Sequence, residues 1–175
     1  MTPAFLHQLA DRFADLEQDL NALDAATGDG DHGATILKGL RAAAAAPDDP
    51  ARAFRMAAGG ASGTLFSHLI DALAQAGPTP LPAALSRAAT RIMQIGMAKA
   101  GDKTMLDALI PAALATDAAA AAHAARAGAE ATRPMAARRG RARHVEGAGV
   151  GHLDAGAVSV AEILELFAAE GEGRE

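Results

Sequence analysis

Apolar residues recur along most of this chain at spacings of three and four residues, with polar residues between them. In the first segment the stripe consists of Phe5, Leu6, Leu9, Phe13, Leu16, Leu20 and Leu23. Residues three and four apart fall on one face of an α-helix, because the helix turns once every 3.6 residues. The pattern therefore predicts an amphipathic helix that ends at the glycine- and aspartate-rich segment 27–33.

Similar helical segments follow through the rest of the chain, separated by short polar loops. Proline and glycine mark their boundaries, since proline interrupts a helix and glycine favours turns. The further helices are expected at about 34–45, 51–58, 64–76, 82–98, 105–115, 117–138 and 157–169. We expect the fourth helix to end at Gly77 and Pro78, and the tail 171–175 to fray.

About eight helices with short connections are typical of an antiparallel bundle or a closed helical barrel. The predicted fold class is therefore all-α, with a single domain over residues 1–170. Four of the connections are polar and contain glycine, and alternate connections of an up-and-down bundle lie at the same end. Loops that are far apart in the sequence can then form one site, and this is where function is expected.

The composition supports a helical core and narrows the function. Hydrophobic residues make up 50% of the chain and aromatic residues only 3%, so small and unbranched side chains must build the core. A formal net charge of -5 argues against a general nucleic-acid binder. The absence of Cys excludes disulfides and thiolate metal sites and fits a cytoplasmic protein. No stretch reaches the roughly 18 unbroken apolar residues of a membrane helix.

Three aspartates follow the first predicted helix in the pattern D-x4-D-x-D: Asp24, Asp29 and Asp31. Carboxylates this close repel one another unless a cation or strong donors compensate their charge. Hard oxygen ligands of this kind suit Mg²⁺, which commonly completes its shell with phosphate oxygens and water. The next helix begins directly afterwards, so its N-terminus could face a phosphate group.

This acidic loop also has structural interpretations. Aspartate and glycine are ordinary turn residues, and aspartate is an ordinary helix cap. A calcium-binding EF-hand is excluded, because a loop starting at Asp29 would need an acid at its twelfth position, which is Leu40. A Walker loop is absent as well. The spacing alone is equally compatible with a divalent-metal site and with a structural turn.

Segment 23–33, in which the three aspartates are followed by His32 and Gly33, resembles the metal-binding loop of the dihydroxyacetone kinase L subunit. The same unit also occurs as the C-terminal domain of ATP-dependent dihydroxyacetone kinases. Three further segments resemble this family, in its order: Gly-Gly-Ala-Ser-Gly at 59–63, Lys-Ala-Gly-Asp-Lys-Thr-Met-Leu-Asp at 99–107, and Gly-Arg-Ala at 140–142 with Gly-His-x-Asp-x-Gly-Ala at 151–157. Four ordered matches over nearly the whole chain are far more specific than any one of them.

The resemblance implies an eight-helix antiparallel barrel that binds ADP or ATP and two Mg²⁺ ions through loops at one end. It implies that Asp24, Asp29 and Asp31 coordinate the metal ions. The residues implied in nucleotide binding are His32, Gly33, Ala34, Thr35, Ala61, Ser62, Gly96, Met105, Arg141, Asp154, Ala155 and Gly156. Among these, Gly96 and Met105 would shape the adenine pocket, and Arg141 is the candidate catalytic residue.

The resemblance also implies phosphoryl transfer to dihydroxyacetone, which is held covalently by a histidine of a separate K subunit. No histidine of this chain is assigned that role. In one version of the family ATP exchanges freely as a substrate. In the other, ADP stays bound and is rephosphorylated by a phosphohistidine-carrying protein of the phosphotransferase system. Catalysis would rest on positioning and electrostatics, without a general base from this chain.

Single residues of these motifs have structural interpretations too. Ser62 could cap the following helix, and Met105 could belong to the core. Arg141 lies in a basic run of a kind that usually faces solvent. Lys103 is interpreted as a surface lysine beside Asp102 rather than as a phosphate ligand. Three histidines on predicted helices are expected to be structural or exposed: His7, His68 and His123.

The chain departs from the family pattern in three places. Segment 31–62 is short, so the second and third helices must be trimmed or merged. Arg143 and His144 occupy positions where the family commonly has a small polar residue and an aromatic one. Ala155 replaces the usual proline after Asp154. These changes bear on affinity and partner docking more than on the fold.

Other functions are compatible with the sequence. A nucleotide-sensing adaptor of a transcription regulator would keep the metal loop but act without the kinase partner. A helical carrier of an apolar ligand would leave the three aspartates without a role. Nucleic-acid binding through the basic segment 133–143 is a weaker third option, which would require steep salt dependence.

Overall fold

The computed structural model describes residues 1–76 and 79–172, and within them helices are the predominant secondary structure. The α-helices are α1 (Pro3–Ala25), α2 (His32–Ala45), α3 (Pro50–Ala58), α4 (Gly60–Gln75), α5 (Leu81–Gly96), α6 (Leu106–Ala113), α7 (Ala118–Ala131) and α8 (Ala155–Glu172). Two short 3₁₀ helices, η1 (Arg141–His144) and η2 (Glu146–Gly149), lie between α7 and α8. The all-α prediction is confirmed. The predicted helix end at Gly77 and Pro78 lies outside the described residues.

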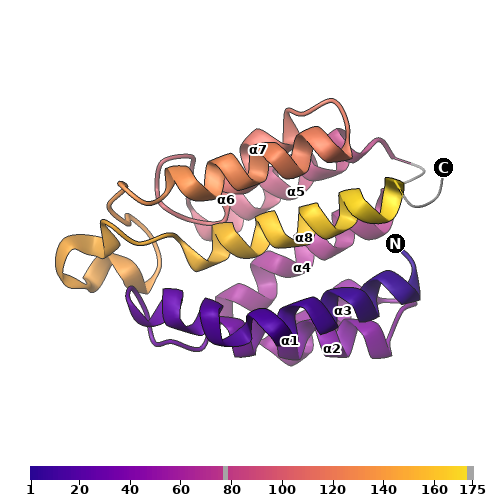
Figure 1. Cartoon of the computed structure of the whole chain (residues 1–175), viewed down its shortest axis with the longest axis horizontal. Helices are drawn as coiled ribbons and strands as arrows, with labels where there is room; N and C mark the ends of the chain where they lie inside the picture. The colour runs from indigo at the N-terminus through magenta and orange to yellow at the C-terminus, as the bar shows by residue number, and fades with distance from the viewer. Residues whose placement is uncertain (77–78, 173–175) are drawn as a thin grey trace.

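The α-helices run up and down around one core and close into a ring (Figure 1). Each helix packs against the next one along the chain, and α8 packs against both α7 and α1. The core consists mainly of buried alanine, leucine and isoleucine side chains, with Phe5, Phe13 and Phe54 among the largest. The prediction of an antiparallel helical barrel is thereby confirmed.

Glycine lets two pairs of neighbouring helices approach closely. A Cβ on Gly33 of α2 would overlap with the backbone carbonyl oxygen of Glu17 in α1. A Cβ on Gly128 of α7 would overlap with the carbonyl oxygen of Asp107 in α6. Since backbone atoms cannot move aside as a flexible side chain can, these glycines set the distance between the two helices of each pair.

Polar contacts join the first and last helices where the ring closes. Glu162 of α8, only 8% exposed, accepts hydrogen bonds from Arg12 of α1 at 2.8 Å and from Arg126 of α7 at 2.6 Å. Further along the same pair of helices, Thr2 Oγ1 donates to Glu170 Oε1 at 2.8 Å. The start of α1 and the end of α8 therefore lie together, at the end of the ring opposite to η1 and η2 (Figure 1).

Three helix boundaries differ from the sequence prediction by three residues or more. α4 begins at Gly60 rather than at 64, because the N–H groups of a first turn need no intrahelical partner and the turn tolerates glycine. α7 ends at Ala131 rather than at 138, because Pro134 cannot donate a backbone hydrogen bond and disfavours helical backbone just before it. α8 runs on through Gly171 and Glu172, which were expected in the frayed tail.

The short segment between the acidic loop and α4 still forms two helices. α2 has 14 residues and α3 only 9, so the segment is trimmed rather than merged. Asp49 caps α3 by accepting a hydrogen bond from the N–H of Arg52, and Pro50 occupies the first helical position. Among the described helices, none combines the length and the apolar content that a membrane crossing requires.

Candidate functional site

Four loops meet at one end of the ring and contribute to the walls of a cavity of about 820 Å³. They connect α1 with α2, α3 with α4, α5 with α6, and α7 with α8. In Figure 1 this end lies on the left, where η1 and η2 are found beside the end of α1. The up-and-down course of the helices brings every second connection to this end, as the sequence predicts.

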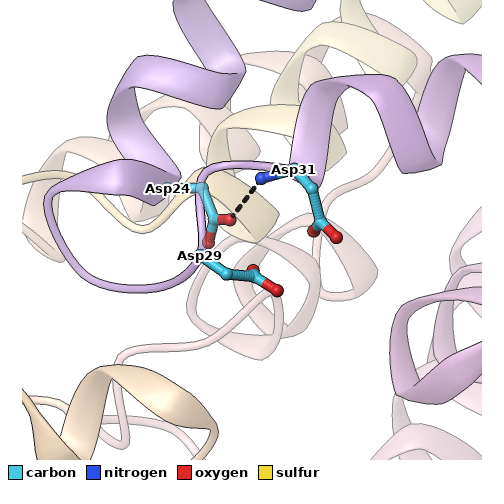
Figure 2. A group of neighbouring side chains, drawn as sticks. All are labelled: Asp24, Asp29 and Asp31. Atoms are coloured by element: carbon cyan, nitrogen blue, oxygen red, sulfur yellow. Dashed lines mark hydrogen bonds between the residues drawn. The ribbon is translucent and has the colours of Figure 1, made fainter.

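The three aspartates converge at this cavity (Figure 2). Asp24 lies in the last turn of α1, Asp29 in the loop, and Asp31 directly before α2. One carboxylate oxygen from each lies within 4.8 Å of those of the other two. Asp24 Oδ2 accepts hydrogen bonds from the backbone N–H groups of Gly30 at 2.9 Å and of Asp31 at 3.1 Å. These bonds fold the loop back onto α1 and hold the cluster together.

The charge of this cluster is only partly compensated. Desolvation raises the pKa of Asp31, and the neighbouring charge of Asp29 raises it further. Arg141 supplies the opposite charge, since its guanidinium pairs with Asp29 and lies 3.7 Å from Asp31 Oδ1. The oxygens thus already hold a cationic group, and carboxylates are the ligands that Mg²⁺ prefers. The residues present therefore fit a divalent cation.

His32 opens α2 beside the aspartates and lines the cavity. Its Nε2 lies 2.9 Å from the hydroxyl oxygen of Ser159 in α8, which is fully buried. Burial lowers the pKa of His32 to about 4, so the imidazole is neutral at physiological pH. The side chain therefore offers hydrogen bonding rather than charge, and Thr35, one turn further along α2, lines the same wall.

The glycine-rich segment forms a second helix start at the cavity. Ala61 and Ser62 lie in the first turn of α4 and line the cavity. The N-cap of α4 is Gly59, and no side chain caps this helix, so the interpretation of Ser62 as a cap is wrong. Backbone N–H groups of a first helical turn have no intrahelical partner and favour anions. Both α2 and α4 thus direct N-termini at the same space.

Part of the cavity lining is apolar. Met105 is 5% exposed and belongs to the core, and it also lines the cavity. Gly96, the last residue of α5, lies in the same wall with Leu65 and Ile92. A surface of this kind suits a flat aromatic group such as a nucleobase better than a charged one.

Asp154 links the cavity to α8. Its Oδ2 accepts a hydrogen bond from the N–H of Ala157 at 2.7 Å, so it caps the helix although Ala155 stands where proline is usual. Its own N–H donates to Thr132 Oγ1 at 2.9 Å. Burial raises the pKa of Asp154 to about 7, and the charge of Asp107 adds to this effect. Ala155 and Gly156, at the start of α8, line the cavity beside it.

The structure brings most of the predicted site residues together. Those that line the cavity are Asp24, Asp31, His32, Thr35, Ala61, Ser62, Gly96, Met105, Arg141, Asp154, Ala155 and Gly156. Asp29 is exposed beside the cavity and belongs to the aspartate cluster. Gly33 and Ala34 lie outside its walls and face α1, where Ala34 N–H donates to Asn21 Oδ1 at 3.1 Å. Their placement positions α2 on α1.

Comparison with known families agrees with this arrangement. A profile described as the DAK2 domain matches residues 26–169, most of the chain and nearly the whole site. This chain belongs to the DAK2 domain family. The same conclusion follows from the ADP-binding subunit DhaL of PEP-dependent dihydroxyacetone kinase 1 from Listeria innocua, which is 30% identical over 93% of this chain and 92% of its own length.

Other relatives of this DAK2 domain are longer proteins. D-erythrulose kinase of Mycolicibacterium smegmatis is 37% identical over 87% of this chain and 32% of its own length. Human triokinase/FMN cyclase is 34% identical over 93% of this chain and 33% of its own length. The dihydroxyacetone kinase from C. freundii, solved in complex with AMP-PNP and Mg²⁺, superimposes with a TM-score of 0.74 at 28% identity, covering 96% of this chain and 33% of that one. The chain thus spans about a third of the length of these relatives.

One residue of the DAK2 domain is placed very differently from the sequence prediction. Lys103 is 3% exposed, so its interpretation as a surface lysine is wrong. Its Nζ lies within hydrogen-bond distance of four backbone carbonyl oxygens between α7 and α8, and the residue lines the cavity. Asp102 beside it is equally buried and accepts a hydrogen bond from the N–H of Lys99 at 3.0 Å.

Sequence reasoning also missed several cavity residues. Thr27, Gly28 and Thr104 line the walls within motifs that had been singled out for their neighbours. Their position next to the aspartates and to Met105 was the signal that could have found them. Arg143 and His144 lie in the cavity wall as well, with Arg143 Nε donating to His144 Nε2 at 2.9 Å. Of the three helical histidines, His7 and His123 are exposed and His68 is half-buried, as expected.

Proposed function

We propose that this DAK2 domain binds ADP or ATP together with Mg²⁺ and acts as the nucleotide-binding part of a kinase for short hydroxyketones such as dihydroxyacetone. One observation carries the proposal. Three carboxylates converge at the edge of a cavity whose other walls present two helix N-termini, an arginine and an apolar surface. The carboxylates suit Mg²⁺, the helix N-termini and the arginine suit the phosphates, and the apolar surface suits the base.

The aspartates would hold the metal. Asp24, Asp29 and Asp31 offer hard oxygen ligands within 4.8 Å of one another, and we propose that they bind two Mg²⁺ ions. When bound, the ions would neutralise phosphate charge and orient the transferred group. The hydrogen bonds from Gly30 and Asp31 to Asp24 keep one carboxylate fixed, while the other two pair with Arg141, which a bound metal ion would displace from them.

The helix starts and the apolar wall would hold the nucleotide. The N-termini of α2 and α4 provide backbone N–H groups for phosphate oxygens, with Thr35 and Ser62 as hydroxyl donors nearby. Arg141 offers a guanidinium, which binds phosphate oxygens in a fork, and we propose it as the residue that stabilises charge during transfer. Gly96 and Met105 would receive the adenine, and Asp154 with the start of α8 would close the site.

A partner would present the acceptor. We propose a K-type subunit or domain that holds dihydroxyacetone or a related ketose, because the DhaL relative is an ADP-binding subunit and other relatives carry this domain within longer kinases. The donor is either exchanging ATP or bound ADP that a phosphohistidine-carrying protein rephosphorylates. A ³²P-transfer assay with the partner, supplied with each donor separately, tells the two apart.

Calorimetric titration of the purified chain with ADP, with and without Mg²⁺, tests nucleotide binding directly. We expect binding that requires Mg²⁺ and is abolished by Asp29→Ala. Asp15→Ala serves as the matched control, since Asp15 is an exposed aspartate on α1 outside the cluster. No binding by the folded wild-type chain at millimolar Mg²⁺, or equal binding by Asp29→Ala, would exclude this function.

A further inference from the structure

The buried lysine of the site makes an unusual set of contacts. Lys103 Nζ donates toward the carbonyl oxygens of Thr132 at 3.0 Å, Met135 at 3.1 Å, Gly149 at 2.6 Å and His152 at 2.6 Å. All four acceptors belong to segment 132–154, which leads from α7 to α8, whereas Lys103 lies in the loop between α5 and α6. A single ammonium group therefore joins the first and last parts of that segment.

Segment 132–154 contains the two 3₁₀ helices and few regular hydrogen bonds. Its internal backbone contacts include Ala137 N–H to Ala148 O at 2.8 Å and Gly151 N–H to Arg133 O at 2.8 Å. An ammonium group has three donors and no acceptor, so it matches a ring of carbonyl oxygens. Thr132 O and Gly149 O also accept backbone hydrogen bonds, from the N–H groups of Met135 and His152, but only the ammonium group joins all four oxygens. Without it, the segment would lose this cross-link.

The same junction reaches the acidic loop. Gly149 has a φ of +73°, and a Cβ there would lie 2.6 Å from Thr27 Cγ2 and 3.5 Å from Lys103 Cε. Glycine is therefore required by both the backbone conformation and the space. Since Thr27 lies in the acidic loop, Lys103 holds Gly149 on one side while Gly149 packs against the aspartate-bearing loop on the other.

Two candidate ligand-binding residues depend on this segment. Arg141 lies in η1 and pairs with Asp29 across the cavity. Asp154 donates its N–H to the hydroxyl of Thr132, whose carbonyl oxygen is one of the four bound by Lys103. A shift of the segment would therefore displace both the guanidinium and the helix cap relative to the aspartates.

We propose that Lys103 is a positioning residue for nucleotide binding. Its ammonium group fixes segment 132–154 so that Arg141 and Asp154 face the acidic loop, and it touches no phosphate itself because its donors are taken up by carbonyl oxygens. The proposal deepens the proposed function and rests on it, since the ligand whose binding is organised is the magnesium nucleotide.

Truncation with chemical rescue tests this role. Lys103→Ala removes three methylene groups and the ammonium, which n-propylammonium can replace in size and charge. At saturating Mg²⁺ we expect the variant to bind ADP at least tenfold more weakly than wild type by calorimetry. Addition of n-propylammonium should restore most of the affinity, whereas n-propanol should not. Lys38→Ala, which removes an exposed lysine of α2, should bind ADP as wild type does.

Amide hydrogen exchange provides a readout that does not depend on nucleotide. In Lys103→Ala, exchange should accelerate over segment 132–154 and return to the wild-type rate with n-propylammonium, while α1 and α4 stay protected. This result would stand even if wild type failed to bind ADP, in which case the proposed function fails rather than the positioning of the segment. Wild-type affinity and exchange in Lys103→Ala would overturn the proposal. So would global unfolding that n-propylammonium does not reverse, because Lys103 would then serve the fold as a whole.

Discussion

Two effects act in opposite directions on the pKa of Asp154: burial raises it, and the hydrogen bond from the N–H of Ala157 at the start of α8 lowers it. As the cap of α8 it accepts the Ala157 N–H, and as a cavity residue it loses hydration, which raises its pKa to about 7. Its unfolded pKa lies near 3.8, so the folded chain holds the proton over a pH range in which the unfolded chain releases it. The stability that this group contributes is therefore present at low pH and is lost as the pH rises from about 4 to 7.

Asp154→Asn should consequently stabilise the ligand-free chain at pH 8. Asparagine caps a helix about as well as aspartate but carries no charge into the cavity. We expect a gain of about 1 kcal/mol or more in the free energy of unfolding at pH 8, shrinking to nearly nothing at pH 4. Urea unfolding of both proteins across this range measures the difference. An Asn variant that is less stable than wild type at pH 8 would contradict the assignment.

Arg141 pairs with two of the carboxylates that we propose as metal ligands, so it would compete with the metal in the chain without nucleotide. Its pairs with Asp29 and Asp31 are largely exposed, so they are worth at most about 1 kcal/mol. Arg141→Gln should therefore bind Mg²⁺ alone up to about fivefold more tightly. It should bind ADP in saturating Mg²⁺ about tenfold more weakly, because a charge-assisted hydrogen bond to phosphate is lost.

Two calorimetric titrations of Arg141→Gln check these opposite effects. Arg138→Gln is the matched control, an exposed arginine from the same basic run that lies outside the walls of the 820 Å³ cavity. Weaker binding of both Mg²⁺ and ADP would indicate that Arg141 stabilises the loop that carries the aspartates and does not compete with Mg²⁺ for their carboxylates.

At this scale the sequence predicted residues whose chemistry is carried by local motifs. The D-x4-D-x-D spacing suggested a cluster of aspartates, and the resemblance to the dihydroxyacetone kinase L subunit implied that His32 and Ser62 lie at the same site. Lys103 was misjudged because its partners lie 29 to 49 residues further along the chain, and no local pattern announces backbone carbonyl oxygens as ligands. The pairing of Arg141 with Asp29, 112 residues apart, likewise depends on how the ring closes.

At the scale of elements, close helix packing rests on glycine. Gly128→Ala should destabilise the chain by about 1 to 3 kcal/mol, because the added methyl group would push α7 away from the Asp107 carbonyl of α6. Gly171→Ala, a helical position with open space around it, should be neutral or slightly stabilising. Thermal and urea unfolding of both variants measure this contrast. Equal behaviour of the two would show that the helix pair can adjust.

Helix ends were predictable from the sequence where a single residue determines them. They were less predictable where neighbouring residues favour different ends. Pro50 and Pro134 set boundaries in the structure, yet the alanine-rich run before Pro134 favoured a longer helix in the sequence reading. The glycines of 59–63 predicted a loop, but only Gly59 remains outside the helices. Glycine marks positions where the backbone adopts an unusual conformation or closely approaches a neighbouring group. Whether such a position lies in a loop or in a first helical turn depends on tertiary packing.

At the scale of the whole molecule, ligand binding should be visible as stability. With Mg²⁺ present and ADP at about 100 times its Kd, linkage adds about 2.7 kcal/mol, which corresponds to about 5 to 10 °C in Tm for a domain of this size. Chelation of the metal with EDTA should remove the whole shift. Differential scanning fluorimetry with and without EDTA measures it, and a shift that persists in EDTA would place the nucleotide away from the aspartates.

The ring itself followed from the sequence because helix number, short connections and small core residues all favour the same arrangement. The polar contacts at its closure did not, since Glu162 bridges α1 and α7 through partners 150 and 36 residues away. The partners of such a buried carboxylate can be identified only from the three-dimensional arrangement of the helices.

The contact between Thr2 and Glu170 has a consequence for how such a unit can be used in evolution and in engineering. The start of α1 and the end of α8 lie side by side, at the end of the ring opposite the loops that line the cavity (Figure 1). A tether can therefore be attached at either side without passing over the cavity. The same unit can then work as a free-standing subunit or as an appended module, and a circular permutant that joins residues 2 and 170 through a short linker should keep the site intact.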